Sequence, residues 1–311
     1  MLSQKKIQAL LYLVGLLYSS KHIVRLLRAI YRTFVRPELS LSRRYGPNSY
    51  AVVCGATNTL GREISKQLAK KGFNIILLSG DEDQLIIMAR ELRSEVPNRE
   101  FRVFPVNMDE CSNTKFYQDV AEQLNTLDIS ILVNNTDLDY YNEFGNIKLR
   151  QCKSMVFVNC LPPVLLTRAL LPKMIKRNNK SAVINVSCGA AVFPMAYYSA
   201  YVGSKALVDS FTKSLAVEFP EVDIMLYTPF DFVEKKENET YDFMTITAEE
   251  SVRGALNDLG HQKKSYGHWR HRLQGYMYEK TPRWLFKHIY LEMVAPKFMK
   301  DVAKSQNSNS N

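Results

Sequence analysis

The stretch that decides the fold is Val52–Arg62, VVCGATNTLGR. An apolar run is followed by a loop with glycines and by the first turn of an expected helix, which is typical of a dinucleotide-binding turn of the G-x-x-x-G-x-G kind. Gly55 and Gly61 hold the outer glycine positions. Thr59 holds the middle one, where glycine would let the backbone approach a pyrophosphate, and a β-branched residue resists the positive φ open to glycine. The stretch predicts a nucleotide-binding fold with a weakened phosphate site.

Strands and helices are expected to alternate around this stretch. The expected strands are apolar at nearly every position and cover residues 50–54, 73–79, 101–106, 129–135, 181–187 and 223–227. The expected helices cover residues 60–71, 83–94, 113–125, 148–177 and 199–219, the fourth interrupted at Pro162 and Pro163. Strands without polar alternation are buried on both faces, so the pattern predicts an α/β fold with one doubly wound parallel sheet, a Rossmann domain. Ligands of such sheets bind where strands end.

Length and composition predict one globular domain with extensions at both ends. The chain has 311 residues and is 46% hydrophobic, which is enough for a large core. We expect a basic N-terminal segment over 1–47, a Rossmann domain with a C-terminal helical extension over 48–300, and a disordered polar tail over 301–311. The five cysteines lack metal-ligand spacing, so we predict no metal site and a reducing compartment.

The N-terminal segment has the pattern of a basic amphipathic helix. Residues 1–37 hold seven Lys or Arg and no acid. The charged stripe comprises Lys21, Arg25, Arg28, Arg32 and Arg36, and the opposite side carries Ile23, Leu26, Leu27, Ile30 and Phe34. The preceding run IQALLYLVGLLY would rise only ~18 Å as a helix, which is too short to span a bilayer core of ~30 Å.

This pattern predicts that residues 1–36 bind an anionic membrane surface, and the alternative is a solvated helix docked on the chain's own domain or on a partner. The segment also resembles a mitochondrial targeting sequence. The expected location is therefore a membrane, either the mitochondrial inner membrane or the endoplasmic reticulum.

The stretch CGAAVFPMAYYSAYVGSK, residues 188–205, carries the candidate chemistry. Tyr201 and Lys205 stand one helical turn apart, 13 residues beyond Cys188 at the end of an expected strand. A carbonyl reductase needs a proton donor beside the substrate oxygen, and a phenol with a pKa near ~10 serves when a neighbouring ammonium favours its anion. With Asn159 in an earlier helix, these residues predict a reductase site.

The sequence resembles the short-chain dehydrogenase/reductase superfamily. Within it, the chain is most similar to the branch of 17β-hydroxysteroid dehydrogenases, inactive-type hydroxysteroid dehydrogenase-like proteins and very-long-chain 3-oxoacyl-CoA reductases. The resemblance is carried by RYGPNSYAVVCGAT, KKGFNIILLS, ILVNN, LLPKMIKR, AVINVSCGAAVFP, YVGSKALVDSF and YGHWRHRLQGY. It implies a catalytic tetrad at Asn159, Cys188, Tyr201 and Lys205, with Cys188 replacing the serine that hydrogen-bonds the substrate oxygen. A thiol is a weak donor, and loss of such a donor costs ~3 kcal/mol.

The resemblance also implies a cofactor, NADP or NAD, held by residues of which several are altered. The implied contacts are Gly55, Thr59, Leu60, Gly61, Gly80, Asp81, Asn107, Asn134, Tyr201, Lys205 and Pro229. Gly80 replaces an arginine that pairs with the 2′-phosphate of NADPH, while Asp81 could accept from the ribose of NADH. Asn107 replaces an aspartate. Asp137 and Glu234 replace a glycine and a threonine, and both add negative charge near the ligand. These departures predict weak nucleotide binding.

Two function classes remain open at this point. The first is a membrane-associated oxidoreductase acting on a lipophilic ketone or alcohol of the steroid or 3-oxoacyl class. The second is a catalytically silent short-chain dehydrogenase fold that serves as an accessory subunit of a mitochondrial membrane assembly. The sequence also leaves open a larger membrane protein complex and a homo-oligomer. Since no groove-reading element accompanies the scattered histidines His261, His268 and His271, we expect no nucleic-acid binding.

Overall fold

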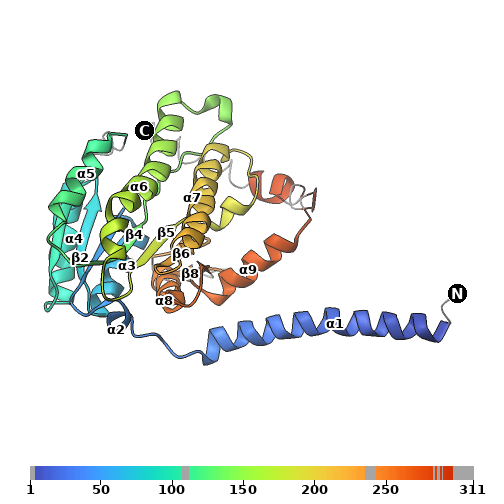
Figure 1. Cartoon of the computed structure of the whole chain (residues 1–311). Helices are drawn as coiled ribbons and strands as arrows, with labels where there is room; N and C mark the ends of the chain where they lie inside the picture. The colour runs from blue at the N-terminus through green and yellow to red at the C-terminus, as the bar shows by residue number, and fades with distance from the viewer. Residues whose placement is uncertain are drawn as a thin grey trace. The chain divides into compact units, whose positions relative to one another are not determined.

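Seven parallel strands form the sheet of this computed structural model, which describes residues 4–106, 112–234, 243–282, 284–285, 288 and 290–296 (Figure 1). Their order is β3-β2-β1-β4-β5-β6-β9. The bounds are β1 Tyr50–Cys54, β2 Asn74–Ser79, β3 Phe101–Pro105, β4 Ile129–Asn134, β5 Ala182–Val186, β6 Asp223–Tyr227 and β9 Lys264–Ser265. The order runs outward in both directions from β1 and β4, so the expected doubly wound sheet is confirmed and its switch point lies between these two strands.

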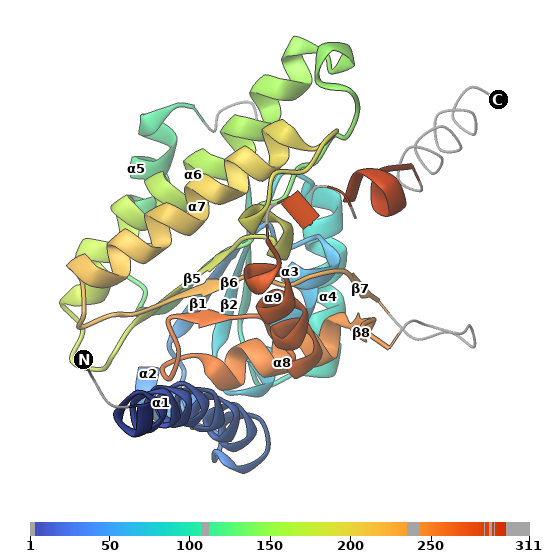
Figure 2. The same cartoon turned by 90° about the vertical axis from the view of Figure 1, so that its right-hand side faces the viewer.

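Helices cover both faces of the sheet (Figure 2). One layer holds α3 Thr59–Lys70, α4 Glu82–Glu95 and α8 Ala248–Asp258. The other holds α5 Thr114–Gln123, α6 Leu149–Ile175 and α7 Ser199–Glu218. Shorter elements follow the central strands: η3 Phe144–Asn146, η4 Gly189–Val192, the pair β7 Phe232–Val233 and β8 Ile246–Thr247, α9 Trp269–Lys280 and the π-helix η5 Tyr290–Val294. The expected strands and long helices are present, whereas β7, β8, β9 and α8 were not predicted.

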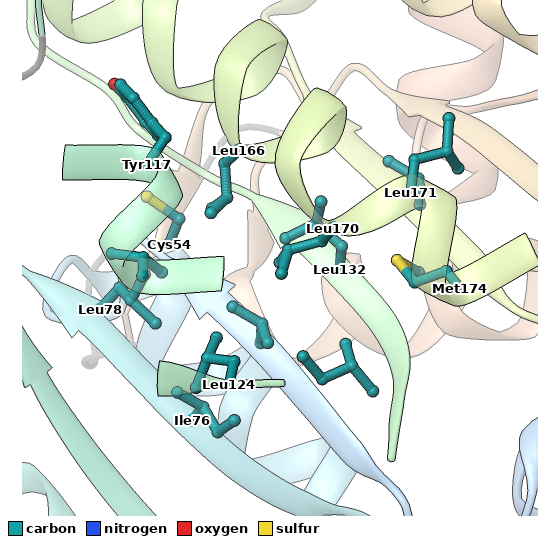
Figure 3. Packing of buried hydrophobic residues seen from close by; sticks show 14 of the residues in the cluster. Cys54, Ile76, Leu78, Tyr117, Leu124, Leu132, Leu166, Leu170, Leu171 and Met174 are labelled. Atoms are coloured by element: carbon teal, nitrogen blue, oxygen red, sulfur yellow. The ribbon is translucent and has the colours of Figure 1, made fainter. Parts of the chain in front are cut away.

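One hydrophobic cluster of the core lies between the sheet and the layer that contains α5 and α6 (Figure 3). Strand residues in it include Cys54, Ile76, Leu78 and Leu132, and helix residues include Tyr117, Leu166, Leu170, Leu171 and Met174. Burial on both faces explains why the strands lack polar alternation.

Helix α6 differs from the expectation, because it continues through Pro162 and Pro163. Each proline removes one backbone hydrogen bond, but both side chains are buried in the packed layer, and this burial offsets the loss. Among the described residues, α6 alone is long and apolar enough to cross a membrane, and 50% of its most apolar window is buried inside the fold. Its apolarity is that of a core helix.

The chain divides into two compact units, residues 1–39 and 40–311. The second begins earlier than the predicted boundary at residue 48, because α2 Leu41–Tyr45 belongs to it: Leu41 and Tyr45 are buried, and the Tyr45 hydroxyl donates to Asp223 at 2.8 Å. The predicted tail over 301–311 lies outside the described residues.

The first unit consists of α1 Gln4–Ile30 and the π-helix η1 Tyr31–Val35. Its helix is longer than the apolar run alone, and large apolar side chains from Leu11 to Val35 are exposed along it. The basic stripe is shorter than expected, because Arg32 lies in the wider π turn and Arg36 follows it in extended conformation.

Candidate active site

The loop after β1 is built around two glycines. Gly55 has φ +75°, and a Cβ there would lie 2.3 Å from the Asn135 carbonyl oxygen. A Cβ on Gly61 would lie 2.1 Å from the Gly55 carbonyl oxygen, so both positions require glycine for close backbone packing. The Asn135 side chain donates to the Gly55 carbonyl at 2.9 Å and to Asn58 Oδ1 at 2.8 Å, which fastens the loop to the end of β4.

Thr59 does not adopt the positive φ that its alignment with a glycine suggested. It is the first residue of α3, after the N-cap Asn58, whose Oδ1 accepts from the Gly61 amide at 2.8 Å. Among the described residues other than glycine, only Asn48 and Tyr197 have positive φ. The first-turn amides of Thr59 and Leu60 have no intrahelical acceptor, so this helix end can still bind an anion.

Of the cofactor contacts expected after β2 and β3, the structure describes Gly80 and Asp81. Gly80 is exposed directly after β2. Asp81 caps α4, since its Oδ1 accepts from the Gln84 amide at 2.9 Å, and its carboxylate therefore has a structural role as well. Asn107 lies outside the described residues.

Asn134 joins β4 to the neighbouring elements of the fold. Its side chain is fully buried, and its amide donates to Thr167 Oγ1 at 3.0 Å and to Asn185 Oδ1 at 2.7 Å. These bonds join β4 to α6 and β5. The side chain therefore positions β4, and the expected contact of Asn134 with a cofactor stays a prediction.

Tyr201 and Lys205 lie on the buried face of α7, one turn apart as predicted. Tyr201 is 6% exposed and Lys205 is 1% exposed. The Lys205 ammonium lies 5.6 Å from the centre of the Tyr201 ring and donates to the Thr136 carbonyl oxygen at 2.8 Å. The α7 helix thus places an acid and a cation beside the end of β4.

Asp137 occupies the space between these two side chains. The Tyr201 hydroxyl donates to Asp137 Oδ1 at 3.0 Å, and the same oxygen lies 2.9 Å from the Lys205 Nζ. The Asp137 side chain is 49% exposed on its other side. The sequence predicted a carboxylate near the cofactor, but the structure places it on the catalytic pair itself.

Asn159 is fully buried and fixes the segment that follows Asp137. Its Oδ1 accepts from the Leu138 amide at 2.8 Å, and its Nδ2 donates to the Leu138 carbonyl at 2.9 Å and to Ser204 Oγ at 3.0 Å. Ser204 in turn donates to the Tyr201 carbonyl at 2.7 Å. Asn159 therefore positions the backbone around Tyr201.

Cys188 follows β5 and packs against the apolar cluster around Tyr201. The neighbouring Ser187 cannot replace it as a donor, because the Ser187 hydroxyl donates to the Lys205 carbonyl at 3.2 Å. Pro229 follows β6 at the same edge, and its carbonyl accepts from the Gly189 amide at 2.8 Å. Glu234, by contrast, is exposed beyond β7.

Aromatic and apolar side chains close over the acid. The Tyr198 ring lies 4.7 Å from the Tyr201 ring, and its hydroxyl donates to Asp139. Ile147, Met155, Tyr140 and Met195 complete this cluster. Tyr198, Ser204 and Asn135 were not predicted as site residues; only Asn135 had a signal, its place in the ILVNN motif at the end of β4.

The surroundings keep Tyr201 protonated. Burial raises the pKa of its phenol far above the ordinary range, and the acidic neighbours Cys188, Asp137 and Tyr198 raise the pKa further. The sequence predicted that Lys205 would lower this pKa, but its ammonium is paired with Asp137 at 2.9 Å.

A dinucleotide fits one end of this site and not the other. The α3 N-terminus offers amides to a pyrophosphate, and Thr136 Oγ1 is buried without a hydrogen-bond partner among the described residues. At the Tyr201–Lys205 end, the groups that would bind a ribose are held by Asp137. In the described part of the chain, no cluster of three or more His, Cys, Asp or Glu could hold a metal ion.

Known proteins share this sequence pattern. The family model for the short chain dehydrogenase matches residues 49–229. Hydroxysteroid dehydrogenase-like protein 1 of Gallus gallus is 30% identical over 80% of this chain and 76% of its own. A very-long-chain 3-oxoacyl-CoA reductase of Macaca fascicularis is 28% identical over 80% of each chain. The inactive hydroxysteroid dehydrogenase-like protein 1 of Pongo abelii is 27% identical over 89% of this chain and 87% of its own.

Solved structures share the fold. A 7β-hydroxysteroid dehydrogenase structure superposes with a TM-score of 0.68 at 20% identity, covering 78% of this chain and 95% of the other. A metagenomic short-chain oxidoreductase in complex with NADP superposes with a TM-score of 0.60 at 23% identity, covering 71% and 96%. The strand order, the glycine loop, the Tyr201–Lys205 pair and these matches together show that the chain belongs to the short-chain dehydrogenase family.

Proposed function

We propose that the protein is an NAD(P)(H)-dependent oxidoreductase of low activity that acts on a lipophilic ketone or alcohol at a membrane surface. The observation that carries this proposal is the buried Tyr201–Lys205 pair at the carboxyl edge of the sheet, beside a free helix N-terminus. The steroid and 3-oxoacyl substrate classes come from the names of the relatives.

In this proposal the chain supplies the proton and the orientation. A bound nicotinamide would donate or accept the hydride. Tyr201 would supply the proton to a ketone oxygen, and burial, which raises the pKa of its phenol, makes it a weak acid, in keeping with the low activity proposed. Asn159 holds Leu138 and Ser204 in place around it, and the wall of Ile147, Met155 and Tyr198 suits an apolar substrate.

Membrane association rests on the first unit. Exposed apolar residues along α1, together with Lys21, Arg25 and Arg28, have the composition of a helix that binds an anionic lipid surface. The exposed apolar surface would then be covered by lipid.

A second candidate is a catalytically silent member of the family that serves as an accessory subunit. Two observations favour it: Asp137 holds both Tyr201 and Lys205, and Cys188 stands where a hydroxyl donor is expected. One relative is itself named inactive.

Nucleotide binding and turnover distinguish the two candidates. We expect calorimetry to give dissociation constants for NADH and NADPH above ~100 μM, equivalent to less than ~5.5 kcal/mol. Oxidation of NADPH with steroid ketones or 3-oxoacyl-CoA should be slow and should disappear in Tyr201→Phe. The matched control is Tyr50→Phe. It removes a phenol hydroxyl at the first residue of β1, whereas the site lies at the carboxyl ends of the strands. Turnover that survives in Tyr201→Phe would refute the assigned acid, and absence of both binding and turnover would support the silent candidate.

A further inference from the structure

We propose that the Asp137 carboxylate is an intramolecular ligand of the Tyr201–Lys205 pair, and that the nicotinamide half of a dinucleotide binds only after this side chain has rotated away. This inference deepens the proposed function and rests on it. In this inference Asp137 does more than add negative charge near the ligand: its carboxylate competes with the nicotinamide ribose for Tyr201 and Lys205.

The contacts of Asp137 are those that a ribose diol would need. One carboxylate oxygen accepts from the Tyr201 hydroxyl at 3.0 Å and pairs with the Lys205 ammonium at 2.9 Å. Lys205 uses a second donor on the Thr136 carbonyl, at 2.8 Å. Since an ammonium has three donors, most of its hydrogen-bonding capacity is satisfied within the chain.

The contact can open by side-chain rotation alone. The Asp137 side chain is half exposed, so its carboxylate can turn into water without unfolding any element. The backbone that follows is fixed, because Asn159 binds both the amide and the carbonyl of Leu138. Competition of this kind weakens the apparent affinity in proportion to the fraction of molecules in which the site is open.

Asp139 provides a matched control within the same segment. Its carboxylate accepts from Tyr198, and none of its described contacts reaches Tyr201 or Lys205. Asp139→Asn therefore removes the same charge from the same segment while leaving the Asp137 contacts intact.

The first test measures nucleotide affinity by calorimetry on the full-length chain. Asp137→Ala should bind NADH and NADPH at least roughly tenfold more tightly than the wild-type protein, which corresponds to an open site in about 10% or less of wild-type molecules. Asp137→Asn should tighten binding less, because the amide still fills the space. Asp139→Asn should bind these nucleotides as the wild type does. ADP, which lacks the nicotinamide half, should bind all four proteins equally.

The second test measures melting temperatures, first without nucleotide and then with NADPH. Asp137→Ala leaves the buried Lys205 ammonium without its counter-ion, so the melting temperature of this variant should lie below that of Asp139→Asn. Addition of 1 mM NADPH, at most about ten times the dissociation constant expected for the wild type, should raise the melting temperature of Asp137→Ala by more than it raises that of the wild type. Equal melting temperatures for the two variants would overturn the inference.

Other outcomes separate this inference from the proposed function. If the wild type binds NADH and Asp137→Ala binds it no more tightly, or tightens ADP equally, the inference fails alone. If neither protein binds NADH or NADPH, the inference and the proposed oxidoreductase function fail together.

Discussion

At the scale of single residues, we expect Cys188 to limit any activity that the site has. It packs beside Tyr201 in the place of a hydroxyl donor, and Ser187 is directed to the Lys205 carbonyl. We expect Cys188→Ser to raise kcat/KM for ketone reduction by roughly tenfold or more, because a hydroxyl stabilises a developing oxyanion better than a thiol. Steady-state kinetics check this, and Cys152→Ser on α6, the same exchange at another position of the same apolar cluster, controls for the change in polarity. An unchanged rate would mean that position 188 does not contact the substrate oxygen.

His271 is expected to make stability depend on pH. It is fully buried, its Nδ1 accepts from the Phe230 amide at 3.3 Å, and burial lowers its pKa from 6.5 to about 4. Between these values the unfolded chain binds more protons than the folded one, so folding free energy is lost as the pH falls from 6.5 towards 4. The full loss is about 3 kcal/mol.

Urea unfolding at several pH values measures this effect. His271→Gln, which is neutral throughout, should show a flatter decline of the unfolding midpoint than the wild type. Substitution of the exposed His261 by Gln serves as the control. Parallel curves for the wild type and His271→Gln would refute the assignment.

At the scale of elements, one carboxylate, that of Asp223 on β6, binds two side chains of α2. The Arg44 guanidinium binds Asp223 through two nitrogens, at 2.6 and 3.0 Å, and the buried Tyr45 hydroxyl donates to it at 2.8 Å. Asp223→Ala should lower the free energy of unfolding by about 2 to 3 kcal/mol, because Tyr45 would be left unsatisfied and the partly buried Arg44 unpaired.

Chemical denaturation measures the loss of unfolding free energy in Asp223→Ala. Arg253→Ala is the control, because the 3.9 Å ion pair of Arg253 with Glu249 is exposed and should contribute less than about 0.5 kcal/mol. Equal losses in the two variants would show that α2 is not anchored through Asp223.

The elements also show how far the sequence could predict this protein. The sheet and its helices were predictable, because burial on both faces produces apolar runs that can be read directly. The continuity of α6 was not, since local propensity at Pro162 and Pro163 is overridden by packing against neighbouring helices that the local sequence does not specify.

The Tyr201–Lys205 pair was predictable from helical spacing. Its contact with Asp137 was not, because Asp137 lies 64 residues before Tyr201 and the contact depends on the rotamer of the Asp137 side chain. Spacing fixes neighbours on one helix, but it does not fix which loop side chain reaches that helix.

At the scale of the whole molecule, the first unit is expected to set the protein's location. Deleting residues 1–36 should release the chain from vesicles that contain phosphatidylserine, while the second unit, which begins at residue 40, keeps its melting temperature. Arg25, Arg28 and Arg32 changed together to Glu should weaken binding roughly a hundredfold or more, at about 1 kcal/mol per charge. Co-sedimentation measures both. A deletion variant that still sediments with vesicles after a salt wash would place the membrane contact elsewhere in the chain.

The strand order also has a consequence for biosynthesis. In the folded sheet, β1 lies between β2 and β4, and Tyr50 pairs with Ile129, about 80 residues later. A ribosome that adds about 5 to 20 residues per second needs roughly 4 to 16 s to make that stretch. Throughout this interval β1, which neighbours the middle strand of the folded sheet, keeps one edge of unpaired amides and carbonyls, beside apolar side chains that α6 does not yet cover. We therefore expect the newly made first half of the domain to need chaperones that shield strand edges until β4 has emerged.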